Sequence, residues 1–100
     1  MKRVIRLRAE AESDLRAAMA WYDNEREGLG GELLADIDST FAEMSEGPAS
    51  FSVVLPPFRR ALLTRFPYAI YFRETEQSVQ VFAVFHARRD PRDLQSKLPK

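Results

Sequence analysis

Residues 65–91 read RFPYAIYFRETEQSVQVFAVFHARRDP and contain the two clearest strand patterns of the chain. Its first part, residues 66–73, alternates between two sets of side chains, and residues 79–86 are almost continuously apolar. Both patterns, rich in aromatic and β-branched residues, are typical of β-strands. The polar residues 74–78 between them lack glycine, which favours a hairpin loop longer than two residues. We therefore predict that the stretch forms the central hairpin of a sheet.

The second strand of this hairpin is apolar on both of its sides. In strict alternation, one side carries Val79, Val81, Ala83 and Phe85, and the other carries Phe82 and Val84. A single layer of helices covers only one face of a sheet. The second side is then covered by the rest of the chain around a central strand, by a terminal helix, or by a partner protein.

The remaining segments show helical and strand patterns. In chain order, the predicted elements are a strand over residues 3–8, helices over 9–27 and 32–46 joined by a turn with Gly28, Gly30 and Gly31, a packed connection over 49–58 with Pro56-Pro57, strands over 59–64, 66–73 and 79–86, and a short helix after Asp90-Pro91 that buries Leu94 and Leu98. This order, β-α-α-β-β-β plus a short C-terminal helix, predicts a single α+β domain over residues 1–100. We expect the helical hairpin to pack on one face of an antiparallel sheet.

The composition excludes several classes of protein. The chain has no cysteine, which excludes a disulfide scaffold and a thiol nucleophile. Its longest apolar run, Val81–Phe85, is too short to cross a bilayer, and charged residues interrupt the N-terminus too early for a signal peptide. No spacing typical of a nucleotide loop, a metal site or a serine triad occurs. We expect a cytoplasmic protein with no metal, no other cofactor and no membrane partner.

Charge is segregated along the chain although the formal net charge is zero. Residues 9–47 contain eleven acidic and two basic residues, so this stretch carries a net charge of −9. The two flanking stretches together carry +9. Such asymmetry indicates faces that attract partners of opposite charge, although charge runs also serve simply as solvated surfaces.

Basic residues gather around the predicted hairpin. The arginines expected at the ends of its neighbouring strands are Arg59, Arg60, Arg65, Arg73, Arg88 and Arg89. Guanidinium groups bind phosphates and carboxylates, and these arginines could equally pair with the chain's own acidic residues. His86 is the only histidine and ends the most apolar strand, so we interpret it as a hydrogen-bonded structural residue rather than a catalyst.

Three segments carry a resemblance to a known family. They are WYD…GLG within residues 21–30, RRALL…RFPYAIY within residues 59–71, and VFHARRDP at residues 84–91. Together they resemble the RelE/ParE toxin superfamily, and within it the ParE-like branch, also called plasmid-stabilisation proteins. The resemblance implies an antiparallel sheet with an N-terminal helical hairpin. It also implies the toxin of a type II toxin–antitoxin system, held inactive by a cognate antitoxin.

The superfamily divides by mechanism. ParE-like members bind and inhibit DNA gyrase, whereas RelE-like members cut messenger RNA in the ribosome. Arg65 and His86 stand where some ribonuclease-type members carry an arginine and a histidine, so they are the catalytic candidates if this chain cuts RNA. Ala87 replaces an aromatic residue of those members, and no lysine occurs between Lys2 and Lys97. These departures favour gyrase inhibition; the alternatives are a ribosome-dependent mRNA endoribonuclease and a non-toxic degenerate member that only binds its partner.

The partner surface is expected on the sheet. The residues predicted to form it are Arg59, Arg60, Arg73, Phe82, Val84, Arg88 and Arg89. We interpret this basic surface as the contact for an acidic antitoxin segment. This interpretation accounts for both the charge pattern and the family resemblance.

Overall fold

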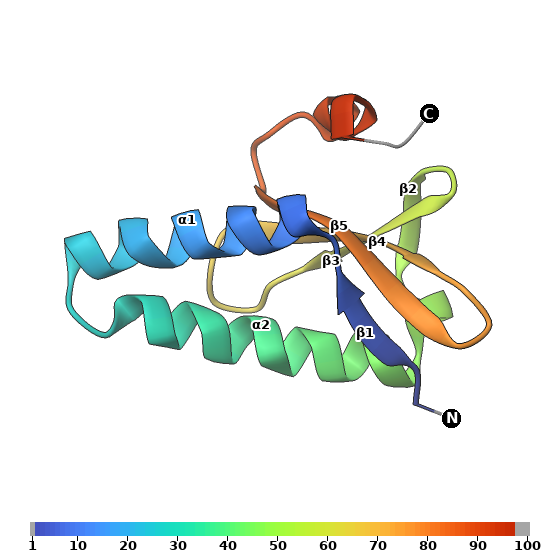
Figure 1. Ribbon diagram of the computed structural model, residues 1–100, viewed down its shortest axis with the longest axis horizontal. Helices are drawn as coiled ribbons and strands as arrows, with labels where there is room; N and C mark the ends of the chain where they lie inside the picture. The colour runs from blue at the N-terminus through green and yellow to red at the C-terminus, as the bar shows by residue number, and fades with distance from the viewer. Residues whose placement is uncertain (1, 98–100) are drawn as a thin grey trace.

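The computed structural model describes the backbone of residues 2–97 and the side chains of residues 2–94 (Figure 1). The elements are β1 (Val4–Leu7), α1 (Ala9–Glu25), α2 (Leu29–Glu46), the short 3₁₀ helix η1 (Pro48–Ser50), β2 (Ser52–Leu55), β3 (Phe58–Leu62), β4 (Tyr68–Glu74), β5 (Ser78–His86) and a second 3₁₀ helix, η2 (Pro91–Lys97). No helix among the described residues is long and apolar enough to cross a membrane.

The predicted α+β architecture is confirmed. The strands form one sheet in the order β1-β5-β4-β3-β2, and α1 and α2 lie side by side against one of its faces (Figure 1). Strands β2 to β5 are antiparallel to their neighbours, but β1 runs parallel to β5. The helices carry the chain from β1 to the opposite edge of the sheet, and three hairpin turns then bring it back beside β1 in the same direction. The purely antiparallel sheet predicted from the sequence is therefore corrected at this one edge.

Two predicted boundaries also differ. The predicted connection over residues 49–58 contains the end of η1 and the edge strand β2, which ends immediately before the cis Pro56-Pro57 bond. Proline is excluded from the middle of a sheet but tolerated at its edge. The two prolines therefore favoured a connection over a short edge strand in the sequence-based prediction. Of the glycines assigned to the interhelical turn, Gly28 adopts a left-handed conformation with φ of 88°, whereas Gly30 and Gly31 belong to the first turn of α2.

A β-bulge in β5 changes which side chains share a face. Tyr71 pairs with Ala83 and Phe72 pairs with Val81, so Phe82 is an extra residue in the strand. The faces predicted from strict alternation are therefore wrong for the residues after Phe82. The core under the helices receives Val79, Val81 and Val84, while Phe82, Ala83 and Phe85 face the other side.

The face away from the helices has a small core of its own. Leu94 of η2 is fully buried there with Phe58, Tyr71 and Phe85, and Val54 and Leu55 of β2 pack against the same cluster. The chain's own C-terminal turn thus covers part of the side of β5 that faces away from the helices. The predicted contact of Leu98 lies outside the described residues.

Candidate functional site

Three arginines lie on the sheet face away from the helices, two of them over the Phe82 ring. Arg6 pairs with Gln80 across the parallel edge, and Gln80 pairs with Arg73 on the other side. The guanidinium carbons of Arg8 and Arg73 lie 4.8 and 5.5 Å from the centre of the Phe82 ring. We call Arg6, Arg8 and Arg73 the arginine cluster. Only Arg73 belonged to the predicted site, although the alternation of Ile5 and Leu7 with Arg6 and Arg8 carried the signal for the other two.

The guanidinium groups of the arginine cluster are only partly engaged in hydrogen bonds and ion pairs among the described residues. Arg73 Nη2 donates to Gln80 Oε1 at 2.9 Å, but the buried Nε of Arg73 has no partner among the described residues. Among the described residues, the one acidic group near Arg8 is Glu10, at 3.9 Å, and the exposed Arg6 has no ion pair. Planar guanidinium groups in such an arrangement suit carboxylates or phosphates.

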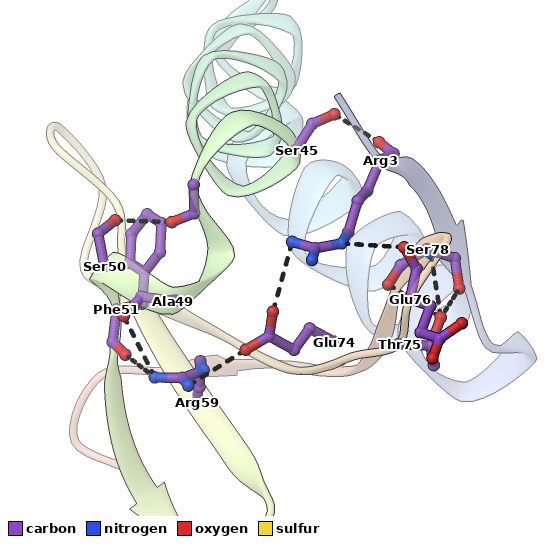
Figure 2. A network of polar contacts seen from close by, with 11 residues as sticks. Arg3, Ser45, Ala49, Ser50, Phe51, Arg59, Glu74, Thr75, Glu76 and Ser78 are labelled. Carbon is purple, nitrogen blue, oxygen red and sulfur yellow. Dashed lines mark hydrogen bonds and ion pairs between the residues drawn. The ribbon is translucent and has the colours of Figure 1, made fainter. Parts of the chain in front are cut away.

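The predicted site residue Arg59 is placed elsewhere, in a network on the helix side of the sheet. Figure 2 shows Glu74 between two arginines: Arg59 Nη2 lies 3.2 Å from Glu74 Oε1, and Arg3 Nη1 lies 3.4 Å from Glu74 Oε2. Arg59 Nη1 also donates to the carbonyl of Phe51 at 2.7 Å. Arg3 extends the network to α2, because its carbonyl accepts a hydrogen bond from the Ser45 hydroxyl. The donors of Arg59 thus join β3, β4 and the segment before β2.

The other predicted arginines of the partner surface do not gather at one point. Arg60 pairs with Tyr71 on the face of the arginine cluster. Arg89 binds Asp93 at 3.1 Å and lies 3.9 Å over the Phe85 ring, while Arg88 is exposed beyond the end of β5. The six arginines expected to converge therefore do not form one group.

Phe82 and Val84 were predicted to share a surface, and the bulge places them on opposite faces. Their exposed fractions are 2% and 3%, so both contribute mainly to packing in the folded chain.

The two ribonuclease candidates occupy different environments. Arg65 Nη2 lies 2.8 Å from Glu32 Oε1. His86 stacks edge-on against Tyr68, and its Nδ1 accepts the Arg88 N–H at 3.1 Å, which leaves the proton of a neutral imidazole on Nε2. Burial first, and neighbouring Tyr22 second, raise the pKa of Tyr68 above 10.0, so its phenol stays protonated at neutral pH. No contact joins Arg65 to His86 among the described residues.

Arg65 has a measurable electrostatic role. The Arg65 hydrogen bond is the largest cause that lowers the pKa of Glu32 below 4.5; burial opposes it, and Arg26 adds to it. A lowered folded-state pKa means that the pair stabilises the fold at neutral pH and that this contribution is lost as the pH falls through that pKa. Arg65→Ala should therefore raise the Glu32 pKa toward 4.5, as followed by carboxyl-carbon NMR. Arg16→Ala, which removes the partner of Glu12 instead, should leave the Glu32 titration unchanged.

The sequence and the fold of the chain are similar to those of known proteins. Residues 5–91 match the family described as "ParE toxin of type II toxin-antitoxin system, parDE". A solved structure titled "Chromosomal ParDE TA system from P. aeruginosa" is similar in fold, with a TM-score of 0.76 at 16% sequence identity, over 87% of this chain and 98% of that one. No curated protein sequence matches the chain. The sequence resemblance to the ParE-like branch is thereby confirmed, and the chain belongs to the family of ParE toxins of type II toxin–antitoxin systems.

Proposed function

We propose that this chain acts by binding and inhibiting DNA gyrase and that a cognate antitoxin holds it inactive. The observation that carries the proposal is the arginine cluster, a basic surface on the sheet with spare guanidinium donors. Such a surface recognises an anionic partner. General-base chemistry requires a base within hydrogen-bonding reach of the substrate proton, and Arg65 and His86 do not assemble around a common point. Both proposed partners belong to the cytoplasm, and neither role needs a metal or another cofactor.

The target is tested by two assays on the purified chain. Gyrase-catalysed supercoiling should be inhibited, and transcripts in a translating extract should stay intact. The double variant Arg65→Ala/His86→Ala should inhibit gyrase as strongly as the parent chain. Cut transcripts with untouched gyrase would instead identify a ribosome-dependent endoribonuclease, and inactivity in both assays would identify a chain that only binds its partner.

The arginine cluster is proposed as the contact for an acidic antitoxin segment. Arg6→Glu should weaken antitoxin binding by about tenfold, mainly through slower association, and the loss should shrink at high salt. Arg6 is exposed, so the thermal midpoint should stay close to that of the parent. The matched control is Arg16→Glu, on the exposed surface of α1, which should change the affinity by less than about twofold. Equal losses in both variants would show only a general dependence on net charge.

A further inference from the structure

The arginine cluster is built on a regular row of residues on the sheet face away from the helices. Arg6, Gln80 and Arg73 pair with one another across β1, β5 and β4. Val4, which is 57% exposed, lies on the same side of β1 as Arg6, because side chains two residues apart share a face of a strand. This surface therefore offers guanidinium groups beside an exposed apolar side chain, and the Nε of Arg73 is still without a partner among the described residues.

The chain itself carries a surface of opposite charge, which the proposed function does not use. We call it the outer face of α2, and its exposed residues recur at helical spacing: Ala35, Asp38, Ser39, Ala42, Glu43 and Glu46. Glu46 lies 3.8 Å from Lys2, but the carboxylates of Asp38 and Glu43 have no ion pair in the described part of the chain. The small side chains between the acidic residues allow a partner to approach the helix closely.

The charges on the two surfaces have compatible spacings. One strand separates Arg6 from Arg73, which puts their Cα atoms about 10 Å apart. Asp38 and Glu43 are five residues apart on one helix, about 7.5 Å along its axis. The long stems of arginine side chains can close a difference of about 2–3 Å. A helix laid across the strands would therefore bring both carboxylates to the two guanidinium groups at once, an arrangement that favours charge-assisted hydrogen bonds.

The two surfaces lie on opposite sides of the molecule. The helices pack on one face of the sheet, and the arginine cluster lies on the other (Figure 1). Two copies therefore cannot each place the outer face of α2 on the arginine cluster of the other at the same time. A contact between these surfaces is head-to-tail, and it leaves one surface of each kind open at the ends of the assembly.

The overall charge of the chain also permits association between copies. The formal net charge is zero, so copies do not repel one another as a strongly charged chain would, and the charges are segregated rather than dispersed. We infer that the outer face of α2 of one copy docks on the arginine cluster of a second copy. An acidic antitoxin segment would compete for the same arginines, but the inference requires neither an antitoxin nor gyrase.

Sedimentation of the purified chain tests the association. At about 100 µM chain in low salt, the average mass should exceed that of a dimer, because each added copy leaves a surface open. The mass should fall toward that of the monomer at about 0.5 M salt, because salt screens the exposed charges. A chain that stays monomeric in low salt would overturn the inference, and so would an association that stops at a dimer.

Two charge reversals test the two surfaces separately. Arg6→Glu alters the arginine cluster, and Glu43→Arg alters the outer face of α2; both residues are exposed. Each variant alone should self-associate at least about tenfold more weakly than the parent. An equimolar mixture should associate again, because each variant supplies the intact surface that the other lacks. Variants that associate like the parent, or a mixture that stays monomeric, would contradict the proposed contact.

Two further reversals control for net charge. Arg16→Glu on α1 and Glu27→Arg in the turn between the helices change the net charge by the same amounts at exposed positions outside both surfaces. Each control should self-associate within about twofold of the parent, and all four variants should keep thermal midpoints close to that of the parent. If the controls lost association as strongly, net charge would govern it and the inference would fail. Because these experiments contain no antitoxin and no gyrase, such a failure would leave the proposed function untouched.

Discussion

Replacing Asp36 with alanine should destabilise the fold by about 3 kcal/mol, because two backbone donors would lose a shared acceptor. Asp36 lies in the middle of α2 and is only 8% exposed. Its Oδ2 accepts the N–H of Arg65 at 2.9 Å and the N–H of Phe66 at 3.1 Å. These groups belong to the loop between β3 and β4, so one side chain connects a helix to the central hairpin of the sheet.

Urea unfolding followed by circular dichroism measures this effect. Asp36→Asn keeps one carbonyl oxygen as an acceptor and should lose less, about 1–2 kcal/mol. Asp38→Ala removes an exposed carboxylate from the same helix and should stay within about 0.5 kcal/mol of the parent. If Asp36→Ala lost no more than Asp38→Ala, the hydrogen bonds to the loop would contribute nothing measurable to stability.

Local patterns in the sequence predict most of the fold. The alternation in residues 66–73 and the apolar run in 79–86 correspond to β4 and β5, and the helical spacing correctly identifies both helices. What local patterns miss depends on pairing between distant segments. The bulge at Phe82 exists because β4 and β5 shift register there, and a single strand read with period two cannot show such a shift.

The candidate site was harder to predict for the same reason. Arg73 was recognised within the hairpin, but Arg6 and Arg8 join it only because β1 lies parallel to β5, more than seventy residues along the chain. Conversely, Arg59 looks like a binding residue in the sequence, and its role in the fold depends on Glu74 reaching it from β4. Acidic partners of arginines are supplied by tertiary structure, so sequence alone overestimates how many arginines are free to bind.

Gly30→Ala should destabilise the chain by about 2–4 kcal/mol, because α1 and α2 meet too closely at this residue for a side chain. A methyl group there would lie 2.6 Å from the backbone carbonyl oxygen of Met19 and 2.8 Å from Asp23 Oδ2. The Asp23 carboxylate is also held by the Gly30 N–H at 2.7 Å, so it cannot move aside without losing that bond. Relief of the clash requires the helices to separate at the end of the hairpin.

The neighbouring glycine makes the comparison decisive, since Gly31 lies in the same turn of α2. A methyl group on Gly31 meets no atom within 4 Å, and its backbone is not left-handed. Gly31→Ala should therefore stabilise the chain by about 0.5–1 kcal/mol through lower entropy of the unfolded state. Thermal unfolding of both variants should shift the midpoint in opposite directions. Two shifts of the same sign would show that helix propensity, rather than the close approach of α1 and α2, governs this turn.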